Sequence, residues 1–276
     1  MIQEIAPKKF HNEYRHEQIR EGAYVCAFYK KGILTRAGQE DLDFPRYEEM
    51  NGRYGKEKYT YLFSIDEQMY FLLDETEEIS LEGFEYMDMY QTRSNPCMYQ
   101  VMAASTAWHL NVWYSSNRFC GRCGKPTVHD DKERMRRCPH CGNLIYPKLL
   151  PAVIVAVTDG DRILLTKYAN RQYTRYALIA GFVEIGETIE ETVQREVMEE
   201  VGLHVKNIRY YKTQPWGFDQ DILTGYVCEV DHERHIHMDT EELAVAEWIK
   251  REDVPDYGER LSLTHEMMRM FKNGKL

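Results

Sequence analysis

The chain has 276 residues, of which 43% are hydrophobic, and this is enough for two domains with cores of their own and one small module. Its net charge of −10 at pH 7 argues against a general nucleic-acid-binding surface. The N-terminal segment MIQEIAPKKFHNEY lacks the pattern of a secretory leader, and no apolar run approaches the ~18 residues of a membrane span, so we expect a cytoplasmic protein without a membrane segment.

The first part of the chain, residues 1–114, is expected to form an N-terminal α+β domain. Apolar and aromatic runs predict strands over residues 22–34, 58–65 and 68–73, and a helix over residues 96–113. Asp66 and Glu67 would form the turn between the last two strands. Since this region is rich in tyrosine and carries no catalytic motif, we expect it to be a scaffold or a dimer contact.

Residues 115–147 contain two C-x-x-C pairs, formed by Cys120, Cys123, Cys138 and Cys141. Four thiolates at this spacing are typical of tetrahedral Zn²⁺, and because no position is left open for water, the ion would be structural. Disulfides are the alternative. The other three cysteines are scattered along the chain, which is typical of a reducing compartment. We therefore predict a zinc ribbon whose fold depends on the metal.

Residues 148–276 are expected to form a C-terminal domain. The runs 152–157 and 162–168 flank an Asp-Gly-Asp turn and predict a β-hairpin. Further strands are predicted over residues 176–183, 204–213, 222–230 and 244–249, and helices over residues 188–201 and 260–273.

The helix predicted over residues 188–201 carries a cluster of carboxylates. Glu196 and Glu200 are four residues apart and therefore share one face, with Glu199 on the adjacent edge. Like charges at this spacing repel each other, whereas a hard divalent cation with oxygen ligands would turn the repulsion into a binding site. We expect Mg²⁺ or Mn²⁺. Arg195 is expected to face away from Glu196 and to pair with Glu187 as structural support.

The segment from Gly181 to Leu203 resembles the Nudix box in its complete spacing. The defined positions are filled by Gly181, Glu187, Arg195, Glu196, Val197, Glu199, Glu200, Gly202 and Leu203. The resemblance implies a hydrolase of diphosphates linked to another moiety, with a Nudix α/β/α sandwich around a mixed sheet, so the whole chain is expected to be of the α+β class. An acidic solvated helix that matches by accident is the alternative.

The residues after the box, Thr213 to Asp221, read TQPWGFDQD, which resembles the SQPWPFPxS signature of the NADH pyrophosphatases, the NudC-type NAD diphosphatases. The departures are Thr213, Gly217, Asp219 and Asp221. From the residues alone, we expect exposed Trp216 and Phe218 to offer flat faces to a nucleobase or nicotinamide, while Gln214 supplies an amide. Ordinary core residues are the alternative. The resemblance assigns substrate contacts to Gln214, Pro215, Trp216, Gly217, Phe218, Asp219, Gln220 and Asp221.

The resemblance also implies further site residues. The metal ligands would be Glu196, Glu200, the nearby Glu199, the carbonyl of Ala180, and Glu242, with Glu241 as the one-residue alternative. Further substrate contacts would come from Glu133, Tyr146 and Thr264. Because the ribbon of one subunit helps to form its partner's site in this family, the resemblance implies a homodimer.

The function implied is hydrolysis of NAD(H) to NMN(H) and AMP, with Glu196, Glu199 and Glu200 as catalytic residues. Removal of NAD caps from RNA is a second implied activity, for which Arg134, Arg136 and Arg137 are candidate phosphate contacts or, equally, a solvated basic strand. One alternative is a hydrolase of another nucleoside diphosphate derivative such as ADP-ribose. Another is a non-catalytic nucleic-acid-binding protein that uses the zinc ribbon.

Overall fold

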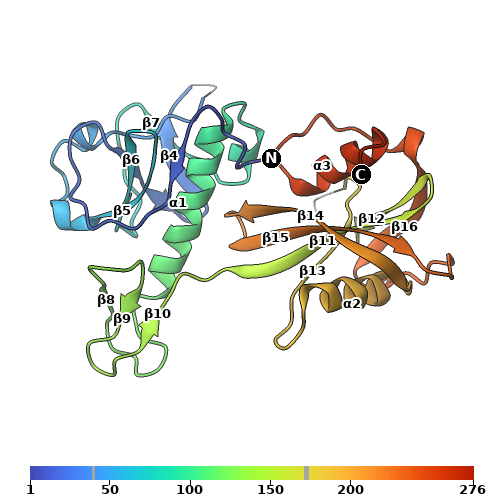
Figure 1. The fold of residues 1–276 in the computed structure, drawn as a ribbon. Helices are drawn as coiled ribbons and strands as arrows, with labels where there is room; N and C mark the ends of the chain where they lie inside the picture. The colour runs from blue at the N-terminus through green and yellow to red at the C-terminus, as the bar shows by residue number, and fades with distance from the viewer. Residues whose placement is uncertain (39–40, 171–173) are drawn as a thin grey trace. The chain divides into compact units, whose positions relative to one another are not determined.

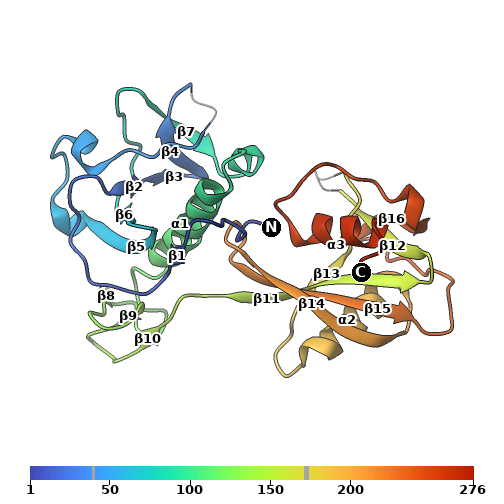
Figure 2. The same ribbon diagram turned by 45° about the horizontal axis from the view of Figure 1, so that its top comes forward.

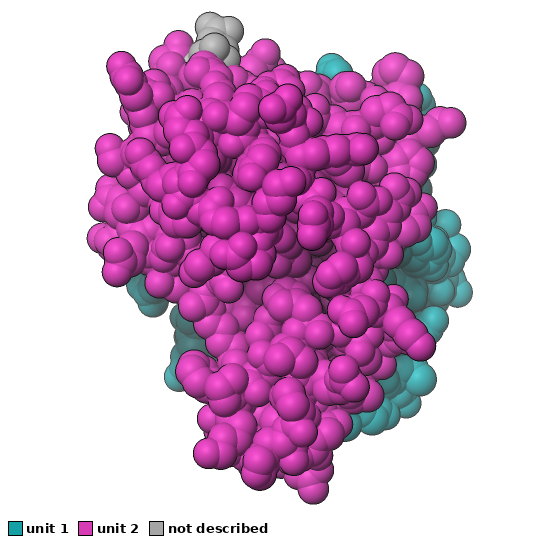
Figure 3. All heavy atoms as spheres, turned by 90° about the vertical axis from the view of Figure 1, so that its left-hand side faces the viewer, with its two compact units in different colours: residues 1, 149–215, 221–276 teal, residues 2–148, 216–220 magenta. Residues whose placement is uncertain are grey.

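The computed structural model describes residues 1–38, 41–170 and 174–276. It divides into two compact units: residues 1, 149–215 and 221–276 form the first, and residues 2–148 and 216–220 form the second (Figure 3). Within the described part of the chain, no helix combines the length and apolarity that crossing a membrane would require.

The first unit is built on a six-stranded mixed sheet. Its strands are β11 (Leu150–Asp159), β12 (Arg162–Tyr168), β13 (Ile179–Phe182), β14 (Val205–Trp216), β15 (Asp221–Val230) and β16 (Leu243–Lys250). The order is β14-β15-β11-β12-β16, and β13 also pairs with β11. Because β11 runs parallel to β15 and antiparallel to β12 and β13, the sheet is mixed, as the Nudix resemblance implies.

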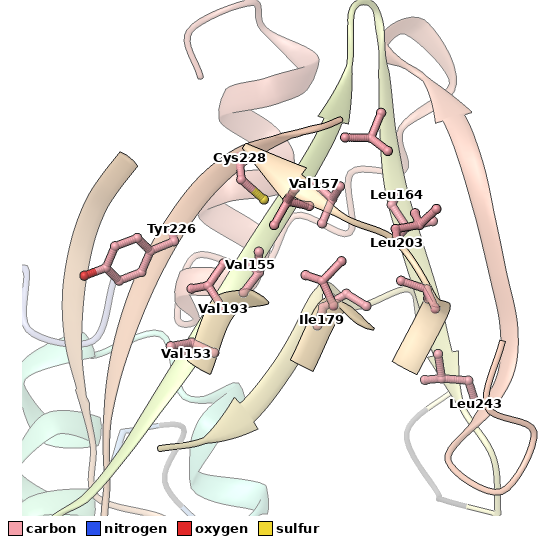
Figure 4. Packing of buried hydrophobic residues seen from close by; sticks show 14 residues of the cluster. Val153, Val155, Val157, Leu164, Ile179, Val193, Leu203, Tyr226, Cys228 and Leu243 are labelled. Carbon is pink, nitrogen blue, oxygen red and sulfur yellow. The ribbon is translucent and has the colours of Figure 1, made fainter. Parts of the chain in front are cut away.

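Two helices cover opposite faces of this sheet (Figures 1 and 2). Helix α2 (Ile189–Val201) packs its valines against Val153, Val155 and Val157 of β11 (Figure 4). Helix α3 (Leu263–Lys272) packs against Ile154 and Ala156, the alternate residues of the same strand. Since successive strand residues point to opposite faces, the fully apolar run of β11 supplies both cores of an α/β/α sandwich. The short 3₁₀ helix η4 (Arg251–Asp253) follows β16.

Outside the ribbon, the second unit contains two small sheets and one long helix. One sheet has the order β1-β5-β6-β2 and the other β3-β4-β7. Their strands are β1 (Phe10–His11), β2 (Tyr24–Cys26), β3 (Phe28–Tyr29), β4 (Gly32–Arg36), β5 (Tyr59–Ile65), β6 (Gln68–Leu73) and β7 (Phe84–Asp88). The helices are η1 (Tyr47–Met50), η2 (Lys56–Lys58), η3 (Gln91–Ser94) and α1 (Met98–Ser116). The ribbon adds β8 (Val128–His129), β9 (Arg136–Arg137) and β10 (Leu144–Ile145), in the order β10-β9-β8.

The predicted elements are confirmed with one exception. The strand expected over residues 22–34 is wrong, because this segment forms β2, β3 and the start of β4 instead. Lys30 adopts a φ of +52°, and with Lys31 it makes the turn that pairs Phe28 with Ile33 across an antiparallel hairpin. A left-handed residue cannot continue a strand. The strand expected over residues 176–183 is shorter, at Ile179–Phe182.

Candidate active site

Helix α2 is capped at both of its ends. Thr188 caps its N-terminus, where the side chain accepts a hydrogen bond from Glu191 N at 3.2 Å and the Glu191 carboxylate accepts one from Thr188 N at 2.8 Å. Gly202 ends the helix in the left-handed conformation, with a φ of +67°. The glutamates between these caps are therefore presented by a fixed scaffold.

Gly181 of β13 makes room for the first of these carboxylates. A Cβ atom at this position would lie 1.9 Å from Cδ of Glu196. The Glu196 carboxylate therefore rests against the β13 backbone beside Ala180, whose carbonyl is a predicted metal ligand. Glycine leaves this space for the Glu196 carboxylate in its present position, and a side chain at residue 181 would require the carboxylate to move away.

Arg195 connects three carboxylates. Its guanidinium donates to Glu187 Oε1 at 2.6 Å, to Glu196 Oε1 at 2.8 Å and to Glu199 Oε2 at 2.9 Å. It also donates to the carbonyl of Phe182 at 2.9 Å. The predicted pair with Glu187 is confirmed. The expectation that Arg195 faces away from Glu196 is wrong, because the planar guanidinium has five donors and reaches both glutamates.

The electrostatics separate the glutamates into two kinds. The hydrogen bond from Arg195 lowers the pKa of Glu187 to about 2. Burial raises the pKa of Glu196, and the negative charges of Glu199 and Glu242 raise it further against the opposing effect of Arg195. Glu187 is thus a permanent anion that holds Arg195, whereas Glu196 sits in a negative field that a cation would relieve.

The remaining predicted ligands lie around this cluster. Glu200 is buried, at 3% exposure, and its backbone carbonyl accepts a hydrogen bond from Asp239 N at 2.9 Å. This bond ties the end of α2 to the turn that carries Glu241 and Glu242, both of them exposed. The negative charge of Glu242 contributes to the raised pKa of Glu196, so Glu242 lies within electrostatic reach of the helix.

Four sulfur atoms form a second cluster, in the ribbon. Cys120, Cys123, Cys138 and Cys141 offer sulfurs that all lie within 4.8 Å of one another. Among the described residues, no other group of three or more His, Cys, Asp or Glu side chains meets this criterion, so the α2 carboxylates are spread more widely. The closest sulfur pairs are 3.5 and 3.7 Å apart, which excludes the disulfide alternative and fits tetrahedral Zn²⁺.

The two halves of the sulfur cluster have the same local geometry. Gly124 N donates to Cys120 O at 2.8 Å, and Gly142 N donates to Cys138 O at 3.0 Å. Both glycines have positive φ values, of 70° and 71°. The hydrogen bond from Arg122 N lowers the pKa of Cys120, whereas, against the hydrogen bond from Lys125 N, burial and the neighbouring sulfurs raise the pKa of Cys123.

Two predicted substrate residues meet on the ribbon. The hydroxyl of Tyr146 donates to Glu133 Oε2 at 3.0 Å, and this carboxylate raises the pKa of Tyr146. Tyr146 is 54% exposed, so most of its ring remains open to solvent. The structure therefore brings these two positions together, although they are thirteen residues apart in the sequence.

Gln214 lies elsewhere than expected. Its side chain is fully buried, donating to Leu261 O at 2.8 Å and accepting from Leu263 N at 2.7 Å. Both ends of the amide bind the backbone at the start of α3, so the amide is not presented to solvent, and a substrate contact of Gln214 stays a prediction. Thr264, half-buried, follows at the next position of that helix.

The aromatic residues of the loop also differ from the prediction. Trp216 is buried, with 8% of its surface exposed, and its indole donates to Asp219 Oδ2 at 3.0 Å. Phe218 is half-buried beside it, whereas Pro215 and Asp219 are exposed. The guanidinium of Arg93 lies 4.8 Å from the centre of the Trp216 ring. The expectation of an exposed Trp216 is therefore wrong.

The basic strand of the ribbon is not an open patch. Arg134 donates to the carbonyls of Asn12 and Leu62, at 3.1 and 2.6 Å. Arg136 is buried and donates to Thr127. Of the three arginines considered as phosphate contacts, only Arg137 is exposed. Arg134 and Arg136 have a structural role in the ribbon, since each guanidinium donates hydrogen bonds to protein oxygens.

Two side chains outside every motif touch the loop after β14. Arg93 belongs to η3, and Trp108 of α1 donates to the carbonyl of Phe218 at 3.2 Å. Both stand more than a hundred residues before the loop. No local pattern in the sequence indicates either contact.

Two segments of the chain match known domain families. Residues 148–271 match the family model of the NUDIX domain, and residues 115–146 match that of the NADH pyrophosphatase zinc ribbon domain. A Nudix hydrolase of known structure from Nitrosomonas europaea is 21% identical, with a TM-score of 0.49, and the alignment covers 56% of this chain and 91% of that one.

Relatives of closer sequence are named NAD-capped RNA hydrolase NudC. The protein from Citrobacter koseri is 42% identical over 146 residues, which are 53% of this chain and 56% of the relative. That from Klebsiella pneumoniae is 38% identical over 161 residues, 58% and 62% of the two chains. The matched region thus spans less than two thirds of these relatives. Residues 148–271 are therefore similar to NUDIX domains, and residues 115–146 are similar to the zinc ribbon domain of NADH pyrophosphatases.

Proposed function

We propose that this chain hydrolyses the pyrophosphate bond of NAD(H) to give NMN(H) and AMP, and that NAD at the 5′ end of RNA is a second substrate. The observation that carries the proposal is the presence in one chain of a carboxylate helix organised by Arg195 and a ribbon of the NADH pyrophosphatase type. The relatives named NAD-capped RNA hydrolase support the same class of substrate.

The proposed ligands of Mg²⁺ or Mn²⁺ are Glu196, Glu200 and Glu242, with Glu199 and the Ala180 carbonyl beside them. All are oxygen ligands, which these hard cations prefer, and a bound cation would offset the burial and the neighbouring negative charges that raise the pKa of Glu196. Bound there, the cations would neutralise charge on the pyrophosphate and lower the pKa of the attacking water.

The chain's own residues would then position the reaction. Arg195, anchored by Glu187, holds Glu196 and Glu199 at the end of β13. The water oxygen joins one phosphorus, the bridging P–O bond breaks, and the proton of the water passes to a carboxylate of the cluster. We assign Glu199 to this proton or to a share of the metal, because it is the most exposed carboxylate held by Arg195.

Substrate recognition is proposed for two surfaces. Tyr146 can stack on a base or nicotinamide ring while Glu133 fixes its hydroxyl. The second surface is the segment 214–221 with Thr264, where the exposed Pro215 and Asp219 are its accessible members. We further propose a cytoplasmic homodimer in which the ribbon, stabilised by structural zinc, completes the partner's site.

The proposal is tested by incubating the purified protein with NADH and either Mg²⁺ or Mn²⁺ and separating the products by chromatography. NMNH and AMP are expected, and Glu200→Gln serves as the inactive control. The same assay with ADP-ribose addresses the alternative that Gly217 and Asp219 have changed the substrate. If ADP-ribose is cleaved and NADH is not, the Nudix chemistry stands and the NAD(H) assignment fails. If neither is cleaved, the result favours the alternative of a non-catalytic nucleic-acid-binding protein.

A further inference from the structure

The tip of the β14–β15 hairpin, residues 216–220, belongs to the same compact unit as helix α1. The closest approach is at Gly217, where a Cβ atom would lie 2.3 Å from the carbonyl oxygen of Ser105 and 2.7 Å from its carbonyl carbon. These are backbone atoms inside a helix and cannot turn aside. The small residues of the segment AASTA, 103–107, leave the helix backbone open to this approach.

This contact explains one departure from the signature. The SQPWPFPxS pattern has proline where this chain has Gly217. A pyrrolidine ring includes a Cβ atom and would meet the same Ser105 carbonyl. Glycine at 217 and the close passage of α1 are therefore two parts of one arrangement.

Trp108 fixes the loop backbone one residue further on. Its indole N–H donates to the carbonyl of Phe218 at 3.2 Å. The indole is itself supported from the β3 side, because its ring centre lies 5.5 Å from that of Phe28. The donor is thus held in position independently of the loop.

Arg93 covers the aromatic pair of the loop. Its guanidinium lies 4.8 Å from the ring centre of Trp216 and 5.8 Å from that of Phe218, and the two rings are 5.0 Å apart. A cation over two rings that contact each other orients both of them. Three contacts, from Ser105, Trp108 and Arg93, therefore converge on residues 216–218.

We propose that α1 and η3 form a packing surface, called the seat below, for residues 216–220 at the tip of the β14–β15 hairpin. Through this surface the N-terminal domain would set the affinity of the site for its substrate. Gly217, Trp108 and Arg93 are positioning residues in this inference. Its kinetic part rests on the proposed function, since residues 214–221 are proposed substrate contacts. Its structural part is independent of any substrate.

The structural part is tested by hydrogen–deuterium exchange of residues 216–220 in Gly217→Ala and Trp108→Phe. Exchange of the loop is expected to rise at least about tenfold in Gly217→Ala and about fivefold in Trp108→Phe, which keeps a ring but loses the donor. Two matched controls should leave the loop unchanged. Gly55→Ala meets only the flexible side chain of Glu57, and Trp248→Phe removes an equivalent indole bond, to Arg234 O at 3.1 Å.

The kinetic part compares KM with kcat for NADH in the same four variants. KM is expected to rise about fivefold in Trp108→Phe and more in Gly217→Ala, with kcat within about twofold of the wild type, because the loop binds but does not react. A purely structural defect would lower the active fraction and leave KM unchanged. Thermal melting identifies a variant that does not fold, in which case Trp108→Phe alone decides.

The outcomes separate the two ideas. If the wild type leaves NADH intact, the proposed function fails, while the exchange measurement still decides whether the seat exists. Loop exchange equal to that of the controls overturns the seat. Faster exchange with an unchanged KM overturns the role of the N-terminal domain in substrate binding.

Discussion

The zinc ribbon and helix α2 use metal-binding side chains in opposite ways. In the ribbon the ligands are themselves the interior, since Cys120 and Cys138 are 2% and 0% exposed and each strand has only two residues. On α2 the interior is made by Val193, Val197 and Val201, all fully buried, while the carboxylates stand on another face. We therefore predict that the ribbon needs its metal to fold, whereas helix α2 would fold without a metal and use one for chemistry.

Zinc removal should give the largest difference between the ribbon and the domain that contains α2. We expect stoichiometric removal by a strong chelator to make residues 115–147 sensitive to proteases while residues 148–271 stay resistant. Structural zinc contributes on the order of 10 kcal/mol, more than a ribbon of this size can replace by apolar packing. Mass spectrometry of the fragments locates the cleavage. A ribbon that resists proteolysis equally well without zinc would show that its fold does not depend on the metal.

Glu200→Gln should give the second largest effect, and this effect concerns α2 instead of the ribbon. We expect NADH turnover to fall at least about a thousandfold, equivalent to roughly 4 kcal/mol, because a neutral amide is a poor ligand for a hard cation. Thermal melting should stay within about 5 °C of the wild type, since the valine stripe is untouched. Glu190→Gln, an exposed change on the same helix, is the control. Near-normal turnover in Glu200→Gln would remove Glu200 from the site.

Acid should loosen the ribbon before it affects α2. Burial, together with the charge of Arg136, lowers the pKa of His129 to about 4, although Asp74 opposes this. The ring packs on Tyr114 at 5.0 Å. Because the folded pKa lies below the ordinary 6.5, the stabilisation is complete above pH 6.5 and is lost as the pH falls toward 4. The loss is at most on the order of 3 kcal/mol.

The measurement is hydrogen exchange of the zinc-loaded ribbon at pH values between 7 and 5, corrected for the intrinsic rate. His129→Gln cannot gain a charge, so its ribbon should show a flatter dependence on pH than the wild type. Protonation of the zinc thiolates affects both proteins alike. Identical profiles for the two proteins would mean that the imidazole does not titrate in this range.

The sequence predicted the first unit better than the second, and the reason is local. The spacing of the glutamates, the valine period of α2 and the turn between β11 and β12 are patterns that each element carries within itself. In the second unit the two turn positions are lysines, Lys30 and Lys31, and the single Gly32 after them was read as part of the strand, so three short strands were predicted as one.

Side-chain environments were predicted less well than elements. Arg93 lies over the buried Trp216, and Arg134 donates to the carbonyl of Leu62. These partners are more than seventy residues away in the chain, so no window around either residue contains the information. For the same reason, the double hydrogen bond of Gln214 to the start of α3 could not be foreseen.

Thr188→Ala should give the smallest effect, and it tests whether the fold of α2 alone positions its carboxylates. It removes the oxygen that accepts from Glu191 N and one partner of the Glu191 carboxylate, which costs about 1 kcal/mol of unfolding free energy. The melting temperature should fall by about 2–4 °C, measured by calorimetry. Turnover at saturating metal should be unchanged, because Glu196 and Glu200 lie two and three turns further along a helix that the valines hold. If turnover fell while the melting temperature did not, the fold alone would not position the carboxylates.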